Sequence, residues 1–302
     1  MVTVLTDADI RSQLSPADAV AWMREAVRAA HTGQLRTPPR ASTDLGAGRL
    51  IFTTGALEGE WYGYRSYDSF NTVPGQQVVI IHDWHSGEVR GIALGNELGP
   101  RRVGAIGGLA VETLTQPTAR TLGIIGSGTQ AFTQLWAIAA VRQLSDIRVY
   151  SRHHEGRIAF VTRAFEDLGL SVTAVDSARA AVEGAEVVVL ATNSARPVID
   201  PGWIADGAFV TTLGPKQVGR AEFGPELIDR ADLVVTDSLQ QTHAYDPPYV
   251  LAGTPQHDRM VSLGEVLDNP PARQTVVFCS VGLAGTEAFL LARLLESADG
   301  VQ

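Results

Sequence analysis

The 302-residue sequence contains a single cysteine, Cys279, so the chain cannot form an internal disulfide. Cys279 lies in an apolar run, where we expect a buried packing role, and the lack of disulfides suits a reducing compartment. The sequence also lacks an uncharged apolar stretch of membrane-spanning length and an N-terminal basic region followed by an apolar one. These absences predict a cytoplasmic protein with no membrane partner.

Basic residues are also in deficit, with 24 Lys and Arg against 33 Asp and Glu and a formal net charge of −9. There is no basic run and no stripe of basic residues interleaved with aromatic ones, so we expect no nucleic-acid partner. The seven histidines lack a helical pair with a third ligand nearby, and His82 and His85 flank a turn. We therefore expect no metal site.

Two patterns divide a chain long enough for two domains. Up to about residue 116, expected helices near 5–10 and 15–33 precede strand-like runs, at 49–54, 61–67, 77–83 and 89–94. From about residue 117, strands alternate with helices, and we expect the strands at 121–125, 146–150, 171–175, 187–192, 208–213 and 232–236. This alternation predicts an α/β fold with a doubly wound parallel sheet. A last strand at 276–280 and an amphipathic helix at 286–297 complete the expectation.

The most informative segment joins the strand at 121–125 to the next helix. The apolar strand residues break into Gly126-Ser127-Gly128, and an amphipathic segment opens at Thr129 or Gln130. In such a G-x-G-x-x-A turn, the first glycine allows the tight turn and the second allows a pyrophosphate to approach the backbone. The helix N-terminus supplies N–H groups and a positive dipole. We predict that these five residues bind a dinucleotide.

The end of the next strand bears on which dinucleotide is bound. A site for NAD usually places Asp or Glu there, to accept from the ribose 2′-hydroxyl. This chain has Ser151 and Arg152 instead. A hydroxyl and a guanidinium suit a 2′-phosphate, so we predict NADP in preference to NAD. The alternative is that Arg152 is an ordinary solvated residue.

Further motifs accompany the glycine turn in a fixed order. They are Leu5-Thr6-Asp7, Arg36-x-Pro38-x-Arg40, Trp61-Tyr62-Gly63-Tyr64-Arg65, Arg101-Arg102-Val103-Gly104-Ala105, Ala185-Glu186-Val187-Val188, Asn193-Ser194-x-x-Pro197-Val198 and Ser280-Val281-Gly282-Leu283-Ala284. Together they resemble the ornithine cyclodeaminase/μ-crystallin family over nearly the whole chain. Several independent motifs in one order are more specific than the glycine turn alone.

The resemblance implies an architecture and an assembly. A Rossmann dinucleotide-binding domain, here residues 117–274, would be inserted into an α+β substrate-binding and dimerisation domain built from residues 1–116 and 275–302. The family binds the carboxylate of an amino, imino or keto acid beside the nicotinamide, so a small anionic substrate and a homodimer are implied.

The resemblance also assigns residues to roles. The positions that match the family's substrate residues are Arg40, Arg65, Arg102, Ser280 and Gly282. Arg65 stands where the family usually has lysine, and it is expected to take part in catalysis as well. Further cofactor contacts are expected from Thr192, Asn193 and Leu213. Three convergent cations would favour an anionic ligand.

Two departures from the family bear on the reaction. Cyclodeaminating members have a glutamate on the strand before the substrate lysine and a catalytic aspartate after a later strand; the aligned residues here are Phe52 and Lys216. Cyclodeamination needs a base for the substrate amines, so ornithine cyclisation is not expected. Lys216 is a candidate general acid or orienting group, and the alternative is a loop lysine that points to solvent.

The sequence therefore predicts an NAD(P)H-dependent oxidoreductase that reduces an imino or keto acid, or runs as an amino-acid dehydrogenase in reverse. Two alternatives stay open. The first is a cyclodeaminase-like lyase that uses bound NAD(P) as a transient oxidant. The second is a nonenzymatic binder of small ligands, as μ-crystallin-like members can be.

Overall fold

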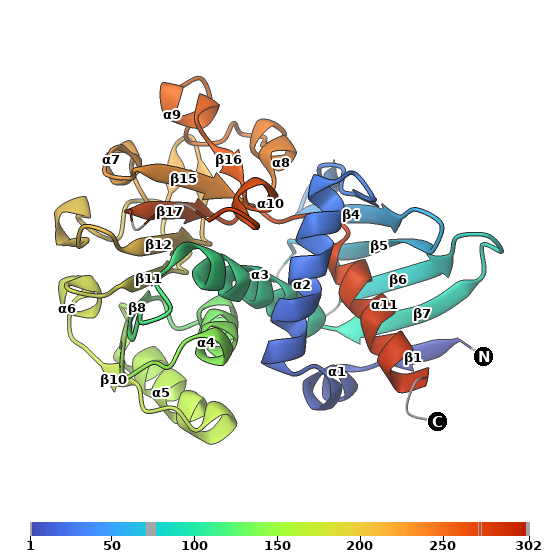
Figure 1. Ribbon diagram of the computed structural model, residues 1–302, viewed down its shortest axis with the longest axis horizontal. Helices are drawn as coiled ribbons and strands as arrows, with labels where there is room; N and C mark the ends of the chain where they lie inside the picture. Colours follow the sequence, from blue (N-terminus) through green and yellow to red (C-terminus); the bar gives the residue numbers. More distant parts are fainter. Residues whose placement is uncertain (1, 71–76, 271, 273, 300–302) are drawn as a thin grey trace. The chain divides into compact units, whose positions relative to one another are not determined.

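The computed structural model describes residues 2–70, 77–270, 272 and 274–299, and it resolves two units. Unit 1 consists of residues 1–102 and 282–302, and unit 2 of residues 103–281 (Figure 1). The chain therefore leaves unit 1, forms unit 2 as one continuous insertion, and returns to complete unit 1. Each unit has its own sheet.

Unit 1 contains a seven-stranded sheet in the order β1-β7-β6-β5-β4-β2, with β3 also paired to β4. All its strand pairs are antiparallel apart from β1 with β7. The strands are β1 (Thr3–Leu5), β2 (Leu35–Arg36), β3 (Ala41–Asp44), β4 (Arg49–Leu57), β5 (Trp61–Asp68), β6 (Gln77–Asp83) and β7 (Val89–Gly95). The predicted strands at 49–54, 61–67, 77–83 and 89–94 are confirmed as β4 to β7.

Helices cover one face of this sheet. They are α1 (Asp7–Gln13), α2 (Pro16–His31) and α11 (Thr286–Asp299). The ring of Phe289 on α11 packs edge to face against the buried Trp61 of β5, with 6.2 Å between the ring centroids. Since side chains alternate along a strand, Trp61 and Arg65 lie on the covered face, while Tyr62 and Tyr64 lie on the other. The residues of β5 that point toward α11 are therefore the buried ones.

Local capping explains where the first two helices begin. The Thr6 side chain accepts from the Asp9 N–H while the Asp9 carboxylate accepts from Thr6, which is a capping box at the start of α1. Ser15 caps α2, and Pro16 takes the first helical position, where its missing N–H costs nothing. Both helix starts were predicted from sequence.

Unit 2 contains an eight-stranded parallel sheet in the order β10-β9-β8-β11-β12-β17-β15-β16. Its strands are β8 (Thr121–Ile125), β9 (Asp146–Tyr150), β10 (Thr173–Ala174), β11 (Val187–Leu190), β12 (Phe209–Thr212), β15 (Leu233–Thr236), β16 (Val261–Ser262) and β17 (Val276–Cys279). A short antiparallel pair stands apart from it, β13 (Lys216–Gln217) with β14 (Arg220–Ala221). The predicted doubly wound parallel sheet is confirmed.

The helices of unit 2 connect these strands. They are α4 (Thr129–Val141), α5 (His154–Leu168), α6 (Ala178–Val182), η1 (Pro201–Trp203), α7 (Pro225–Asp229), α8 (Leu239–His243), α9 (Pro255–Asp258) and α10 (Leu263–Val266). Helix α3 (Leu98–Leu114) begins in unit 1 and continues into unit 2. No helix in the described part of the chain is long and apolar enough to cross a membrane.

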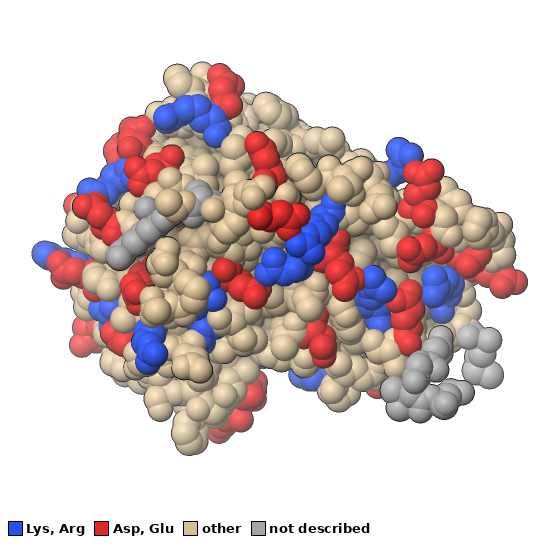
Figure 2. Space-filling view, in the orientation of Figure 1, with Lys and Arg blue, Asp and Glu red and all other residues tan. Residues whose placement is uncertain are grey.

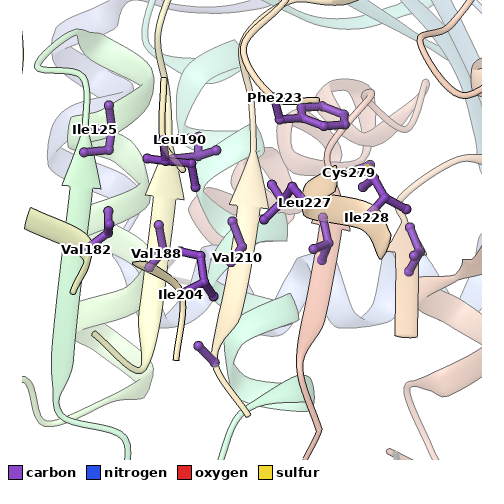
Figure 3. Packing of buried hydrophobic residues seen from close by; sticks show 14 of the residues in the cluster. Ile125, Val182, Val188, Leu190, Ile204, Val210, Phe223, Leu227, Ile228 and Cys279 are labelled. Atoms are coloured by element: carbon purple, nitrogen blue, oxygen red, sulfur yellow. The ribbon is translucent and has the colours of Figure 1, made fainter. Parts of the chain in front are cut away.

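The core of unit 2 is aliphatic and follows from the strand sequences. Strands β11 and β17 are buried along their whole length, as expected for central strands of a parallel sheet. Figure 3 shows Val188 and Val210 from neighbouring strands beside Ile204, with Leu227 and Ile228 of α7 over the adjoining strands. Cys279 belongs to this cluster and is fully buried, which confirms the expected packing role.

The boundaries of the units differ from the bounds expected from sequence, 116/117 and 274/275. The division instead falls within α3, at Arg102/Val103, and after β17, at Val281/Gly282. The strand β17 pairs with β12 and β15 inside the parallel sheet, so the chain crosses back only after this strand ends. A strand this apolar needs cover on both of its faces, which an internal position in a parallel sheet provides.

Charged side chains are dispersed over the surface. On the face shown in Figure 2, Lys and Arg residues are interspersed with Asp and Glu residues. Some of this mixing is local to helices, as in the Arg163–Asp167 and Arg179–Glu183 pairs, each four residues apart. Such exposed pairs contribute little to stability.

Candidate functional site

The glycine turn of unit 2 connects β8 to α4 and has two differently constrained glycines. Gly126 has a φ of +114°, and a Cβ there would lie 2.2 Å from the Ala191 carbonyl oxygen. Gly128 has an ordinary φ of −86°, and a Cβ there would meet nothing within 4 Å. Gly126 is therefore required by the fold, whereas the space at Gly128 is not used by the protein itself.

The first turn of α4 leaves hydrogen-bonding capacity free. Gly128 is the N-cap residue, and no side chain caps the helix. Its N-terminal N–H groups carry the positive end of the helix dipole, which favours a negatively charged group. The buried Gln130 Oε1 has no hydrogen-bond partner in the described structure. These features suit the binding of an anion by backbone groups, and the dinucleotide site at residues 126–130 stays a prediction.

The structure brings this turn next to the end of β9. The hydroxyls of Ser127 and Ser151 lie 3.0 Å apart, and the Ser151 hydroxyl also donates to the His153 carbonyl at 3.1 Å. Arg157 donates to the Ser151 carbonyl at 2.8 Å and pairs with Asp176 at 3.2 Å. Arg152 is exposed on this loop. Ser127, Ser151 and Arg152 thus belong to one local surface at the carboxyl end of the sheet.

A buried carboxylate that sequence reasoning did not single out organises the neighbouring strand ends. Glu222 is fully buried and accepts from the Thr192 N–H at 2.9 Å, the Thr192 hydroxyl at 2.8 Å and the Leu213 N–H at 3.0 Å. It also accepts from the Gly214 N–H at 2.5 Å. Both oxygens are satisfied by donors that follow β11 and β12. Glu222 therefore fixes the loops that carry Thr192, Asn193 and Leu213.

Lys216 is the only lysine in the sequence, and its side chain is buried. Its Nζ donates to the Gly214 carbonyl at 2.7 Å, and its backbone lies in β13. The alternative of a lysine that points to solvent is therefore wrong. Lys216 also lies close enough to Cys279 to act against the effect of burial, which raises the pKa of that thiol. The lysine side chain is thus held at the carboxyl end of the parallel sheet.

Ser280 and Asp237 connect the ends of β17 and β15. The Ser280 hydroxyl donates to one oxygen of Asp237 at 3.3 Å, and the Val281 N–H donates to the other at 2.8 Å. The segment that precedes Gly282 is therefore anchored within unit 2 by a carboxylate. Gly282 itself has a φ of +95°.

In unit 1, two of the predicted substrate residues meet at a buried glutamate. Glu287, in the first turn of α11, accepts from Arg65 Nη1 at 2.7 Å and forms a close ion pair with Arg102 Nη2 through the same oxygen. The Glu287 side chain is 1% exposed, and that of Arg102 is 5% exposed. Sequence reasoning did not identify Glu287, because the two pairs join residues 222 and 185 positions apart.

The two arginines differ in how their donors are used. Arg65 gives Nε and Nη2 to the Gln77 side-chain oxygen, at 3.0 and 2.6 Å, and its guanidinium lies 4.0 Å from the centre of the Tyr67 ring. Every guanidinium nitrogen of Arg65 thus has a partner. Arg102 Nε and Nη1, in contrast, are buried without one, and so is Glu287 Oε2.

The charge of Glu287 is stabilised by its neighbours. Burial alone would raise the pKa of its carboxyl group, but Arg102 and Arg65 outweigh that effect and hold the pKa below its ordinary value. Two positive groups and one negative group remain, which leaves one net positive charge. Such a buried group favours a single anion.

The register of the sheet shows which residue of β4 lies opposite Arg65. Arg65 pairs across the strands with Thr53, whereas Phe52 pairs with Ser66 and so points to the opposite face. The residue that faces Arg65 from β4 is therefore Thr53, which also has no carboxylate. Arg40 is half-buried directly before β3, and its place beside the other two arginines stays a prediction.

A doubly wound parallel sheet inserted into a second, mainly antiparallel sheet unit defines a two-unit α/β protein of the Rossmann class. The chain belongs to the ornithine cyclodeaminase/mu-crystallin family, whose model matches residues 1–299. This confirms the resemblance found in the sequence.

Individual relatives agree with this assignment. The chain is 26% identical to an alanine dehydrogenase from Archaeoglobus fulgidus over 249 residues, which cover 80% of this chain and 75% of that protein. Its fold is similar to that of Thermococcus litoralis Δ1-pyrroline-2-carboxylate reductase in complex with NADH and L-proline. The TM-score is 0.89 at 23% identity, and the match covers 98% of this chain and 97% of the other. The fold is also similar to that of an archaeal alanine dehydrogenase dimer with bound NAD. That comparison has a TM-score of 0.86 and 23% identity, and it covers 99% of this chain and 96% of the other.

The two glycines of the turn give a matched test of the dinucleotide site. We expect Gly128→Ala to leave the melting temperature of the ligand-free protein unchanged, because the methyl group meets no protein atom. It should weaken dinucleotide binding at least about fivefold, since an added methyl in a tight contact costs roughly 1–3 kcal/mol. Titration calorimetry with NADPH and NADH measures the effect.

Gly126→Ala is the contrasting variant. Its positive φ and the 2.2 Å approach to Ala191 predict a lower melting temperature even without ligand, by a destabilisation of roughly 1–3 kcal/mol. Unchanged dinucleotide affinity in Gly128→Ala would contradict the prediction that this turn contacts the dinucleotide.

Proposed function

We propose that the protein is an NAD(P)H-dependent oxidoreductase that reduces an imino or keto acid, or oxidises the corresponding amino acid. The observation that carries this proposal is the match to one family over residues 1–299, with relatives named as an alanine dehydrogenase and a pyrroline-2-carboxylate reductase. The neighbouring structures hold NADH and L-proline or NAD, which suggests a nicotinamide cofactor here as well. Unit 2 would bind the cofactor, and unit 1 would bind the substrate and form the dimer.

The residues of unit 2 fit a dinucleotide. The uncapped start of α4 and the open space at Gly128 suit the pyrophosphate, which residues 126–130 would hold. Thr192, Asn193 and Leu213 lie beyond β11 and β12, where ligands bind in a doubly wound sheet. When bound, the reduced nicotinamide would supply a hydride to the C=N or C=O carbon. Glu222 would keep the cofactor-facing loops in place.

The residues of unit 1 fit a carboxylate. Arg102 offers two buried donors without partners, Nε and Nη1, which lie on different edges of the guanidinium, and a carboxylate oxygen can accept from Nη1. Gly282, whose Cβ position lies 3.7 Å from Arg102 Nη1, leaves room beside these donors. Arg65 contributes charge from a position fixed by Gln77 and Glu287, and Arg40 is proposed as a further cation.

Lys216 is the proposed proton donor. A buried ammonium group can hold a proton for the developing amine or alkoxide and then regain it from water. Its contact with the Gly214 carbonyl fixes the position of Nζ. Ser280 would place the backbone that leads to Gly282. With Arg65, Lys216 completes the set of residues that we propose for the chemical step.

We further propose that NADP is preferred over NAD. The support is Arg152, exposed beside the paired hydroxyls of Ser127 and Ser151, with no acidic residue at the end of β9. Arg152→Ala should weaken NADPH binding about tenfold, the size of one lost charge-assisted hydrogen bond, and leave NADH binding unchanged. Arg179→Ala, in which the lost arginine is paired with Glu183 at 2.7 Å, is the control. Equal affinities for NADPH and NADH in the wild type would contradict this assignment.

The homodimer is proposed on the uncovered face of the unit 1 sheet. Val4, Ile92, Ile80 and Tyr64 are paired in one row across four strands, on the face opposite to α11. Val4 and the nearby Leu94 are 47% and 45% exposed. Apolar residues in such a row favour burial by a second copy of the chain.

Ile80→Asp should convert the dimer to a monomer, because it places a charge in the middle of this row. Ile158→Asp, on an exposed apolar position of α5 in unit 2, should not change the assembly. Sedimentation velocity distinguishes the two masses. If Ile80→Asp is still a dimer, the interface does not include this row of residues.

A substrate panel tests the reaction itself. NADPH and NADH oxidation is followed by absorbance with Δ1-pyrroline-2-carboxylate and with keto acids plus ammonia. We expect turnover with at least one of them, and no proline or ammonia from L-ornithine with oxidised cofactor. Ammonia release without net NAD(P)H consumption would favour the lyase, and ligand binding without any turnover would favour the nonenzymatic binder.

A further inference from the structure

The ion cluster of Arg65, Arg102 and Glu287 in unit 1 contains more hydrogen-bonding capacity than it uses. Arg102 Nε and Nη1 are donors without partners, and Glu287 Oε2 is an acceptor without one. All three atoms are buried, on residues that are 4% and 1% exposed. Buried polar atoms are nearly always paired, so three orphaned atoms in one ion pair need an explanation.

A purely structural role does not account for this pattern. Glu287 would be fully used if each oxygen received one arginine, yet both arginines share Oε1 and leave Oε2 unpaired. Arg65, in the same cluster, has a partner for every nitrogen through Gln77 and Glu287. The unused capacity is therefore confined to one side of the cluster, on Arg102 and Glu287.

The unpaired donors of Arg102 and the unpaired acceptor of Glu287 are complementary to the carboxylate and the N–H group of an α-amino or α-imino acid. The Nη1 donor of Arg102 matches an oxygen of a carboxylate. The ionised Glu287 Oε2 only accepts, so it matches an N–H group. A keto acid provides the carboxylate but has a carbonyl oxygen where the imino acid has N–H. That oxygen would face Glu287 Oε2, and two acceptors repel each other.

We propose that Glu287 is the residue that reads the substrate nitrogen: its free oxygen accepts from the iminium or ammonium N–H while Arg102 holds the carboxylate. The inference rests on the proposed function and narrows its substrate class to zwitterionic imino and amino acids, in preference to free keto acids. Within the cluster the ligand carboxylate would pair with Arg102 and the positive nitrogen with Glu287. Because a zwitterion has no net charge of its own, the cluster keeps its one net positive charge, and the preference rests on these local pairings.

The position of Glu287 suits this role. Arg102 and Arg65 keep the pKa of its carboxyl group low, so it stays ionised and acts as an acceptor instead of a donor. It lies in the first turn of α11, where the helix dipole also favours a negative charge. Gly282, next to Arg102 Nη1, has no side chain that could occupy the space beside the cluster.

The test compares two ligands of the same shape in the protein saturated with oxidised dinucleotide. L-Proline carries a protonated nitrogen beside its carboxylate, and tetrahydrofuran-2-carboxylate has an ether oxygen in that place. Titration calorimetry should show that the wild type binds L-proline at least about tenfold more tightly. Glu287→Gln removes the charge but keeps the shape, and we expect the ratio to fall below about threefold.

Two further variants separate recognition from folding. Glu287→Asp keeps the charge and should keep a preference for L-proline, even if both ligands bind more weakly. Glu58→Gln is the matched control, because Glu58 is also in unit 1 and also pairs with an arginine, Arg36 at 3.3 Å, but is exposed. It should leave the ratio unchanged. Melting temperatures show whether any variant has lost its fold.

The outcomes distinguish this inference from the proposed function. Equal binding of the two ligands by the wild type, binding of neither, or an unchanged ratio in Glu287→Gln would overturn the role of Glu287. If the substrate panel nevertheless shows NAD(P)H oxidation, only the inference fails and the reductase stands. If the panel shows no turnover with any imino or keto acid, the proposed function fails, whatever the binding ratio is.

Discussion

The Glu222 carboxylate joins the ends of two neighbouring parallel strands, because its oxygens accept from Thr192, Leu213 and Gly214. A buried charge is costly unless every lone pair is satisfied, and here backbone and hydroxyl donors supply that compensation. Most of these donors are backbone N–H groups, which have no rotamers of their own. Their hydrogen bonds to Glu222 therefore hold the backbone of the loops after β11 and β12 in one arrangement. The same loop holds the carbonyl of Gly214, to which Lys216 donates, so one carboxylate also determines where the only lysine lies.

Unit 1 depends on a second buried carboxylate of a different kind. Glu287 is neutralised by two guanidinium groups and leaves one oxygen unpaired, whereas both oxygens of Glu222 accept from backbone N–H groups and a hydroxyl. The first arrangement keeps net charge and hydrogen-bonding capacity in the interior. The second uses all of its capacity for structure. The difference is the reason why we propose a ligand contact for Glu287 and not for Glu222.

Local features were predictable from sequence, and long-range pairings were not. Gly126 and Gly128 are identified by their neighbours in the chain, because a strand, a tight turn and a helix start are all encoded within residues 121–131. The capped starts of α1 and α2 are local in the same way. Glu222 and Glu287, however, are ordinary glutamates in sequence. Their roles come from partners up to 222 positions away, which only the fold brings together.

Side-chain direction was also outside the reach of sequence. Phe52 and Thr53 are neighbours in sequence, and only the pairing of β4 with β5 shows that Thr53 lies opposite Arg65 while Phe52 points to the other face. A shift of one residue moves a side chain to the other face of a strand, so spacing alone does not fix it. The buried position of Lys216 was likewise undecided until β13 and its contact with Gly214 were known.

The carboxylate of Glu287 bears on the choice between lyase and reductase. A lyase needs a base that takes protons from ammonium groups, and a carboxylate whose pKa is held low by two arginines is a weak base. The same low pKa makes it a good partner for a positive nitrogen, and an iminium accepts hydride more readily than a neutral imine does. One electrostatic arrangement therefore disfavours proton abstraction and favours reduction.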